Sequence, residues 1–371
     1  MRVETHHLKP GSVLKEDVYA KASNPLMKAG TKLTEEHIAF LKAFLIEAVN
    51  AEPSSSLSSY ARRRNTDSIE KQTESRPLVP PPVKTSAVQS AVQLSGDANY
   101  QLAQATYKTS FRNWQSGGPI DIWALRKVVI PLLEEGLANS FWLSGYLTSD
   151  RPVRTQSDRS LAFGLLAAFL AKKMDEPQGD VLQYGLVGLL ADASLAKQSP
   201  VLLDKREDEL LDHERKLFER HPLDSYNMLK NVTSLRHEFV QAVAGHHERE
   251  DGSGYPLHLN GAQLDRPSKY LAVCCELLQR MRMRPGSGSI IPALDWMENH
   301  TFDKLSKILF RKLESELMTL FIGARVRLSD QRTGKITFID EANPTMPIVA
   351  LENGDILQLS THRTLKIISV V

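Results

Sequence analysis

Apolar residues recur at helical spacing through most of the chain, and this pattern limits the fold more than any other feature. Between about residues 98 and 318, nearly every segment places its apolar residues three or four positions apart. Examples are Leu102, Ala105, Phe111 and Trp114, then Ile122, Leu125, Val129, Leu132 and Leu133, and then the stretches 158–174 and 181–196. The sequence therefore predicts a mainly α fold with an all-helical bundle at its centre.

Segments with strand character lie on both sides of this helical region. Residues 1–52 contain short strand-like pieces, followed by a helix that starts with Thr34 as its N-cap and runs through Ile46. After Ile322 the period changes to two, and the turn sequence ENGD separates two of the strand-like pieces. We therefore expect a small N-terminal α+β module over 1–52 and a small C-terminal β module over 319–371.

Residues 53–97 differ from both neighbours because they are rich in serine, proline and charge and poor in large apolar side chains. Such a composition cannot bury enough apolar surface to order the chain, so we predict a flexible linker there. Residues 61–64 read ARRR, but without interleaved aromatic residues this patch is interpreted as solvated charge. The helical domain is then predicted over 98–318.

Charge and cysteine content exclude several classes of function. The 46 basic and 44 acidic residues nearly cancel, which argues against a nucleic-acid partner, so an anionic ligand would need a local site. The two cysteines, Cys274 and Cys275, are adjacent and cannot form a disulfide framework. No signal peptide is visible, and the longest apolar run, at 161–171, is too short to span a bilayer. These features predict a cytoplasmic protein.

Histidines and one aspartate form a candidate metal site in the helical region. His221 stands before Pro222 where a helix N-cap is expected, and His246 and His247 close a helix predicted to start near Ser234. Asp192 ends an apolar helix. Imidazole and carboxylate together suit Fe, Mn or Zn. Five other histidines are isolated in the sequence and are interpreted as ordinary core or surface residues: His213, His237, His258, His300 and His362.

Residues 245–256 read GHHEREDGSGYP, and this segment carries a specific resemblance. It matches the pattern HHExxDGxGYP at eight positions, namely His246, His247, Glu248, Asp251, Gly252, Gly254, Tyr255 and Pro256. The chain thus resembles the HD-GYP family of cyclic di-GMP phosphodiesterases, strongly over about 145–285. The resemblance implies a helical HD-type bundle, and the terminal modules look like accessory modules of some relatives.

The resemblance also implies a metal-ligand set, of which only part is present. Active family members bind two or three ions, and a bridging water or hydroxide attacks the phosphodiester. The matching ligands are Asp192, His221, His246 and His247, with Asp192, His246 and His247 as the catalytic residues. Three other ligand positions fall on Gln156, Ala191 and Cys275. Cys275 is interpreted as an inert small hydrophobic residue and Glu276 as a solvated helix position. We therefore expect reduced metal occupancy.

Several functions remain open at this point. The favoured prediction is a degenerate phosphodiesterase, weakly active or inactive, that acts by binding or docking. The alternative is an active enzyme that converts cyclic di-GMP to pGpG or GMP with a reduced or substituted metal set. A third hypothesis is docking to a diguanylate cyclase through the signature loop. A general HD nucleotide phosphohydrolase ranks last because Ala191 replaces the histidine of the HD pair. The substrate-binding or docking residues would be Asp251, Gly252, Gly254, Tyr255, Pro256 and Arg284. No oligomeric state follows from the sequence.

Overall fold

A computed structural model of the protein describes residues 2–18, 27, 29–33, 38, 41, 46, 48–52, 85–199, 202–203, 205–283, 290–362 and 364–371. The chain forms two compact units, Met1–Pro81 and Pro82–Val371. The predicted site residue Arg284 lies outside the described residues, as do residues 53–84 of the predicted linker.

The N-terminal unit contains a three-stranded antiparallel sheet. Its strands β1 (Arg2–Glu4), β2 (Val13–Leu14) and β3 (Ala48–Glu52) lie in the order β1-β3-β2, and a short 3-10 helix covers Thr5–His7. The buried core comprises Leu8, Leu14, Val18, Met27, Leu33, Ile38, Leu41, Val49 and Ala51. Of the helix predicted to run to Ile46, Ile38 and Leu41 are described as helical, whereas Thr34 lies outside the described residues.

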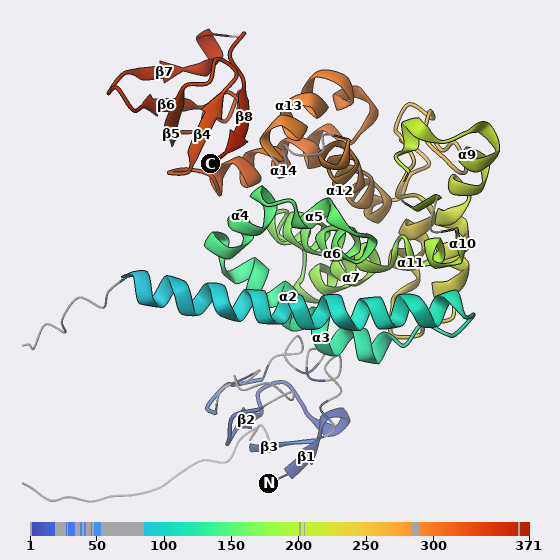
Figure 1. Cartoon of the computed structure of the whole chain (residues 1–371). Coiled ribbons are helices and arrows are strands. Elements are labelled where there is room, and N and C mark those ends of the chain that lie inside the picture. The colour runs from blue at the N-terminus through green and yellow to red at the C-terminus, as the bar shows by residue number, and fades with distance from the viewer. Residues whose placement is uncertain are drawn as a thin grey trace, which may run out of the picture. The chain divides into compact units, whose positions relative to one another are not determined.

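Twelve α-helices of the described residues form the central bundle (Figure 1), which confirms the predicted mainly α fold. They are α2 (Thr85–Gln115), α3 (Ile122–Ala138), α4 (Ser140–Thr148), α5 (Arg151–Arg154), α6 (Gln156–Lys173), α7 (Gln178–Leu190), α9 (Asp212–Phe218), α10 (His221–Leu229), α11 (His237–Ala244), α12 (Arg266–Arg282), α13 (Ile290–His300) and α14 (Lys307–Thr319). Short 3-10 helices cover Ala193–Lys197, Glu207–Glu209 and Phe302–Lys304. Among these helices, none combines the length and apolar character needed to cross a membrane.

Helix α2 corrects the predicted domain boundary. It begins at Thr85, inside the range 53–97 that we predicted as linker, so the helical domain starts earlier than residue 98. The composition of its first turns explains the error, because small and polar residues such as serine, threonine, glutamine and glycine stand between its apolar residues, as they do in linkers. Figure 1 shows α2 along one side of the bundle, with α3 beside it.

Helices α6 and α7 form the centre of the bundle, and glycine lets them approach closely. A Cβ on Gly164 of α6 would stand 2.6 Å from the carbonyl oxygen of Gly185 on α7, and one on Gly188 would stand 3.0 Å from that of Phe163. The apolar run at 161–171 is buried on all sides in this pair. Because α6 begins at Gln156 and α7 ends just before Asp192, their packing fixes two positions of the candidate site.

The C-terminal module is a five-stranded antiparallel sheet. Its strands are β4 (Arg325–Leu328), β5 (Thr333–Phe338), β6 (Ile348–Leu351), β7 (Ile356–Gln358) and β8 (Ile367–Val370), in the order β7-β6-β5-β4-β8, and a 3-10 helix covers Leu359–Thr361. The alternating residues Val326, Leu328 and Ile336 face its interior, as the period of two predicted. Lys366 Nζ, just before β8, lies 2.5 Å from Asp295 Oδ1 of α13 and ties the sheet to the bundle.

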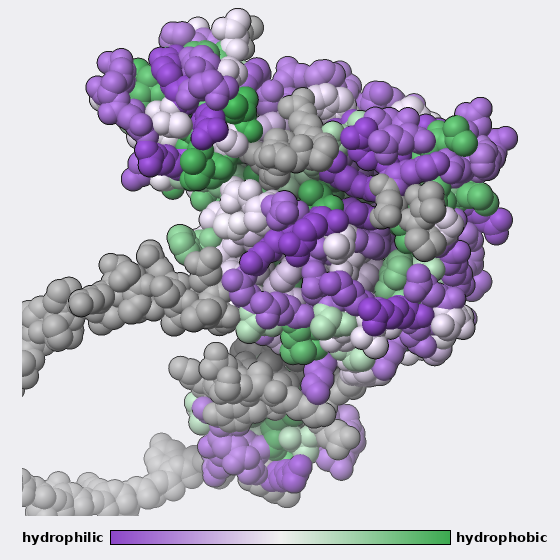
Figure 2. Space-filling view, in the orientation of Figure 1, coloured by the Kyte–Doolittle hydropathy of each residue, from purple (hydrophilic) through white to green (hydrophobic). Residues whose placement is uncertain are grey.

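The visible face of the bundle is largely hydrophilic, with small separated hydrophobic patches (Figure 2).

Two carboxylates, the buried Glu314 and the partly exposed Glu298, lie between α13 and α14. Arg311 Nη1 is 3.0 Å from Glu314 Oε2, and Arg311 Nη2 is 2.6 Å from Glu298 Oε1. The other carboxylate oxygens, Glu314 Oε1 and Glu298 Oε2, have no hydrogen-bond partner among the described residues. Burial and the charge of Glu298 together raise the pKa of Glu314 from 4.5 to about 7. One arginine therefore does not fully compensate two carboxylates.

This raised pKa predicts a pH-dependent effect of Glu314→Gln. The folded state holds the Glu314 proton more tightly than the unfolded state does. Protonated Glu314 therefore contributes to the free energy of unfolding below pH 4.5, and this contribution is lost as the pH rises through 7. The variant should be more stable than wild type by about 1–3 kcal/mol at pH 8 and nearly unchanged at pH 5. Urea unfolding at both pH values measures the difference.

Glu316→Gln on the same helix is the matched control with the opposite sign. Burial opposes ionisation of Glu316, but hydrogen bonds from Lys173 and Lys312 outweigh it and lower its pKa. Ionised Glu316 therefore stabilises the fold above pH 4.5, so Glu316→Gln should lower the free energy of unfolding at pH 8. Equal effects of the two substitutions on the free energy of unfolding at pH 8 would contradict the opposite pKa shifts of Glu314 and Glu316.

Candidate metal centre

The four predicted metal ligands converge in the structure. Donor atoms of Asp192, His221, His246 and His247 all lie within 4.8 Å of one another. The three histidines are buried, whereas Asp192 is partly exposed to a pocket. Residues more than fifty positions apart in the sequence therefore form one compact donor group. The five discounted histidines are all exposed and lie outside it: His213, His237, His258, His300 and His362.

The local structure around the histidines differs in detail from the prediction. Helix α11 starts at His237 instead of near Ser234 and ends at Ala244, so His246 and His247 occupy the turn after the helix. His221 is the first residue of α10 and not its N-cap. Gly245 explains the early end of α11, because glycine favours the termination of a helix. A turn frees both adjacent rings to face the same group, with ring centroids 4.2 Å apart.

Backbone carbonyls orient two of the imidazoles. His221 Nδ1 lies 2.6 Å from the carbonyl oxygen of Phe218, and His246 Nδ1 lies 2.6 Å from that of Val243. Because a carbonyl oxygen only accepts, each Nδ1 donates its proton, and the Nε2 of a neutral ring then presents a lone pair to the site. Such hydrogen bonds commonly fix the orientation of metal-binding histidines.

The spacing of the donor atoms suits the ligand shell of one ion. His221 Nε2 lies 3.2 Å from Asp192 Oδ1 and 3.3 Å from His246 Nε2, and His246 Nε2 lies 3.5 Å from Asp192 Oδ1. Ligand atoms placed about 2.0–2.1 Å from a tetrahedral ion lie about 3.3 Å from one another. Three imidazoles and a carboxylate are also ligands that Zn, Fe and Mn accept. The donor set therefore fits one divalent ion, which would act as a Lewis acid toward a phosphate oxygen.

The protonation states favoured here are those that metal binding requires. Burial alone would raise the pKa of Asp192, but contacts with His221 and His246 outweigh it and hold this pKa well below its ordinary value. Burial lowers the pKa of His246 despite the opposing effect of Asp192, and it lowers the pKa of His247 well below the usual range. An ionised carboxylate and neutral imidazoles are the forms that bind metal.

Of the three positions at which the resemblance predicts lost ligands, two lie at the candidate site itself. Gln156 Nε2 is 3.4 Å from Asp192 Oδ2, and Cys275 Sγ is 3.8 Å from both ring nitrogens of His247. Ala191 is fully buried and has no side-chain donor. Cys275, interpreted from the sequence as an inert hydrophobic residue, therefore lies beside a candidate ligand.

Glu276 does not occupy the solvated position that we predicted for it. Its side chain is buried, and it pairs with Arg249 of the signature loop and with Arg280, whose Nε lies 2.6 Å from Glu276 Oε1. The guanidinium group of Arg280 also stacks over the ring of Trp296 at 3.9 Å. This pairing directs Glu276 toward the loop and explains why the sequence-based interpretation was wrong.

Most residues of the HD-GYP-like signature determine the shape of its loop. The buried carboxylate of Glu248 accepts hydrogen bonds from the backbone N–H groups of Leu257 (2.6 Å) and Leu259 (2.9 Å). Asp251 Oδ1 accepts from the backbone of Ser253 at 3.0 Å, and Gly252 has a φ of +76°. A Cβ on Gly254 would stand 2.4 Å from Glu248 Cα. These four signature positions are therefore explained by loop geometry alone.

Tyr255 connects this loop to the metal ligands. Its ring stacks on His247 with centroids 4.5 Å apart and an interplanar angle of 18°. Pro256 follows it in a cis peptide bond. The structure thus brings Tyr255 to the site, whereas Asp251 stays exposed at the tip of the loop.

Two arginines at the site were not identified from the sequence. Arg159 and Arg282 line the same pocket as Asp192, His247 and Cys275. Helical spacing could have found them: Arg159 is three residues after Gln156 on α6, and Arg282 is seven residues after Cys275 on α12. Side chains at these intervals share one face of a helix.

Comparison with known proteins agrees with the family resemblance. A family model described as an HD domain matches residues 143–304. The chain is 30% identical over 184 residues to cyclic di-GMP phosphodiesterase PA4108 of Pseudomonas aeruginosa, covering 48% of this chain and 43% of that protein. It is 22% identical over 167 residues to cyclic di-GMP phosphodiesterase PdeB of Borreliella burgdorferi, covering 43% and 42%. The HD domain of this chain belongs to the HD-GYP family.

Two further comparisons place the HD-GYP domain among its relatives. It is 34% identical over 110 residues to 3'3'-cGAMP-specific phosphodiesterase 1 of Vibrio cholerae, covering 28% of this chain and 24% of that protein. In fold the chain resembles Bd1817, an HDG"Y"P protein from Bdellovibrio bacteriovorus, with a TM-score of 0.51 and 14% identity over 84% of this chain and 97% of that one. The chain spans less than half the length of each of these curated relatives. Family membership, predicted from the GHHEREDGSGYP segment, is confirmed.

Proposed function

We propose that the protein acts in cyclic di-GMP signalling, with an HD-GYP domain that binds about one divalent ion and hydrolyses cyclic di-GMP weakly or not at all. On this proposal its role in the cell, in the cytoplasm, is binding or docking. The single observation that carries it is the composition of the site: four ligand positions converge on one group, while three others hold Gln156, Ala191 and Cys275. The named relatives that act on cyclic di-GMP support the choice of ligand.

The reason lies in how paired metal ions act on a phosphodiester. Two ions about 3.5–4 Å apart stabilise both the attacking and the leaving oxygen, and this requires ligands for each ion. Ala191 offers no donor atom, and the amide of Gln156 lies within hydrogen-bond reach of Ser160, Asp192 and Arg159. The amide nitrogen is not a metal ligand, and the amide oxygen already accepts a hydrogen bond from Arg159, so the second ion loses support on this side of the pocket.

The alternative is an active phosphodiesterase with a substituted metal set that gives pGpG or GMP. The position of Cys275 Sγ, 3.8 Å from both nitrogens of His247, favours it, because a thiolate there could bind Zn or Fe. Docking of a diguanylate cyclase through the signature loop, in which Asp251 is exposed and Tyr255 lies at the site, stays a prediction.

Metal content and turnover decide between weak and full activity. Purified protein supplied with Mn or Fe should hold about one ion per chain and hydrolyse cyclic di-GMP at a negligible rate. Elemental analysis and chromatography of the reaction products measure the two quantities. Exchanging Gln156, Ala191 and Cys275 together for His, His and Asp should raise the metal content. Rapid turnover by wild type that disappears in Cys275→Ala would instead establish the alternative.

A further inference from the structure

We propose that Glu4, His6 and His7 form a second metal-binding site, in the N-terminal unit, for zinc or a similar divalent ion. The last residue of β1 and the 3-10 helix Thr5–His7 supply the three side chains. One donor atom of each side chain lies within 4.8 Å of a donor atom of the other two. The matched HD domain covers residues 143–304, so the inference goes beyond the proposed function and does not depend on it.

The carboxylate of Glu4 is in contact with both imidazoles. His6 Nε2 lies 3.3 Å from Glu4 Oε2, and His7 Nδ1 lies 3.7 Å from the same oxygen. The two rings have centroids 4.0 Å apart and are tilted by 49°. Ligand atoms placed about 2.0–2.1 Å from a tetrahedral ion lie about 3.3 Å from one another. Small side-chain rotations therefore bring the three donor atoms into the ligand shell of one ion.

The backbone that carries these side chains is held on both sides. Glu4 is paired within the β1–β3 ladder. The next residue, Thr5, is buried and donates a hydrogen bond from its hydroxyl group to the carbonyl oxygen of Ile46. Leu8, directly after the 3-10 helix, lies in the core of the unit. Binding an ion therefore requires the ordering of side chains alone, which lowers its entropic cost.

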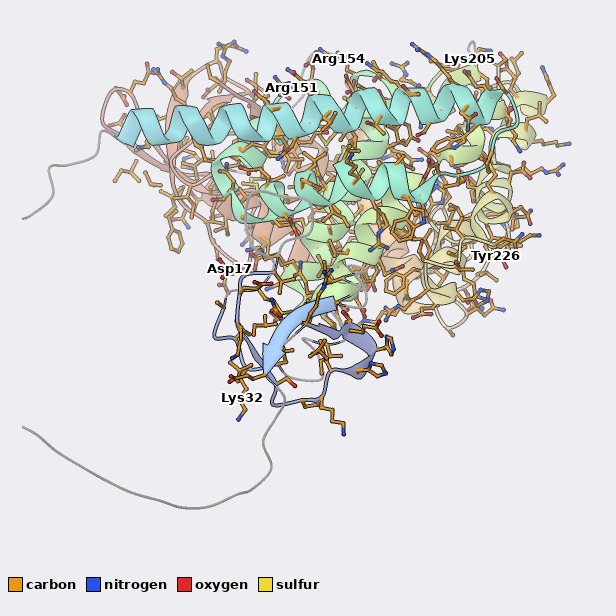
Figure 3. The ribbon with its side chains drawn as sticks, turned by 90° about the horizontal axis from the view of Figure 1, so that it is seen from below. Asp17, Lys32, Arg151, Arg154, Lys205 and Tyr226 are labelled. Carbon is orange, nitrogen blue, oxygen red and sulfur yellow. The ribbon has the colours of Figure 1, made fainter. Side chains whose placement is uncertain are left out.

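The surroundings of the group leave its donor atoms open to an ion from solution. The side chains of His6, His7 and Glu4 are 65%, 68% and 61% exposed. Other carboxylates of the same unit have partners elsewhere: Asp17 (Figure 3) accepts from the backbone N–H of Ala29 at 2.7 Å, and Glu52 Oε1 lies 2.5 Å from Lys15 Nζ. Glu4 differs from them because its contacts are with two groups that can themselves bind metal.

The donor set determines which ions should bind. Two imidazoles and one carboxylate are ligands that zinc accepts, and a water molecule can complete a tetrahedral shell. The affinity of nitrogen and oxygen sites for divalent ions rises from Mn through Fe to Cu, with Zn well above Mn. A solvent-exposed site with three ligands should therefore hold Zn or Cu and bind Mn poorly. Measurements with Mn then report the candidate metal centre of the HD domain, whereas measurements with Zn report both sites.

Zinc titration of the untagged full chain against a colorimetric chelator tests the site, because an oligohistidine tag would bind the same ion. Wild type should hold about one more zinc ion per chain than His6→Gln or His7→Gln, and Glu4→Gln should bind that ion about 10-fold more weakly. Exposed pairs contribute little to stability, so thermal unfolding in EDTA should match wild type. His213→Gln, which changes an isolated exposed histidine of α9, is the matched control and should bind zinc as wild type does.

A second background separates the two sites. In His246→Ala, which removes a ligand of the candidate metal centre, the zinc ion of the N-terminal unit should remain, and adding His6→Gln should remove it. Zinc content that neither His6→Gln nor His7→Gln changes would overturn the site. Wild-type zinc affinity in Glu4→Gln would overturn the three-ligand assignment. Either result would leave the proposed function intact, because the HD domain supplies none of these ligands.

Discussion

Replacing His246 with alanine should weaken the binding of Zn or Mn to the protein by about 100-fold or more. The Nε2 of His246 lies 3.3 Å from that of His221 and 3.5 Å from Asp192 Oδ1, so it occupies the middle of the donor group. Three ligands would remain for the ion, and the carboxylate of Asp192 would lose its contact with His246. Competition against a colorimetric chelator measures the affinity, and elemental analysis measures the stoichiometry.

Two further variants make this result interpretable. His237→Ala changes an exposed histidine of α11, the helix that leads to His246, and should leave metal binding unchanged. Because His246 is fully buried against Phe163, its removal could also reduce stability. Asp192→Asn keeps the size of the side chain and removes the charge, so it should lose metal without a comparable loss of packing. Full metal occupancy in both His246→Ala and Asp192→Asn would place the ion elsewhere.

The second large effect is expected at Gly254 in the signature loop. An alanine Cβ there would stand 2.4 Å from Glu248 Cα and 2.4 Å from the backbone nitrogen of Arg249, so the backbone itself would have to move. We expect Gly254→Ala to lower the free energy of unfolding by about 1–3 kcal/mol, as overpacking of a buried site does. Urea unfolding followed by circular dichroism gives this value.

The effect of Gly254→Ala should reach the metal site as well. Displacing the loop moves Tyr255 away from its stacked position on His247, so metal affinity should fall along with stability. Gly145→Ala in α4 is the matched control, because no atom lies within 4 Å of its new Cβ. Gly145→Ala should raise the free energy of unfolding by about 0.5–1 kcal/mol, since alanine favours a helix over glycine. Equal stability of the two variants would contradict the close approach at Gly254.

The sequence predicted the bundle and the metal ligands for different physical reasons. Helical periodicity survives in a single chain because each helix buries one face, so the elements between residues 98 and 318 were visible. The candidate ligands followed from the chemistry of histidine and carboxylate and from the resemblance carried by GHHEREDGSGYP, and their role as metal ligands stays a prediction. The start of α2 at Thr85 was hidden, because its first turns carry polar and small residues that also characterise linkers.

Contacts between distant elements were the part that the sequence could not supply. The pairing of Glu276 with Arg249 depends on how α12 packs beside the signature loop, and the anchoring of Arg282 depends on carbonyls almost eighty residues away. The turn position of His246 and His247 depends on where α11 ends. Each of these features is tertiary, so residue patterns along one helix carry little trace of it.

The buried carboxylate of Glu248 bears on how chains of this type are recognised. Two backbone N–H groups converge on it, and the missing side chain of Gly254 makes room for the fold of the loop around it. A chain that lost every catalytic ligand would still need these residues to keep its turn. The motif therefore reports the architecture of the loop, and on the proposed function the residues at positions 156, 191 and 275 decide activity.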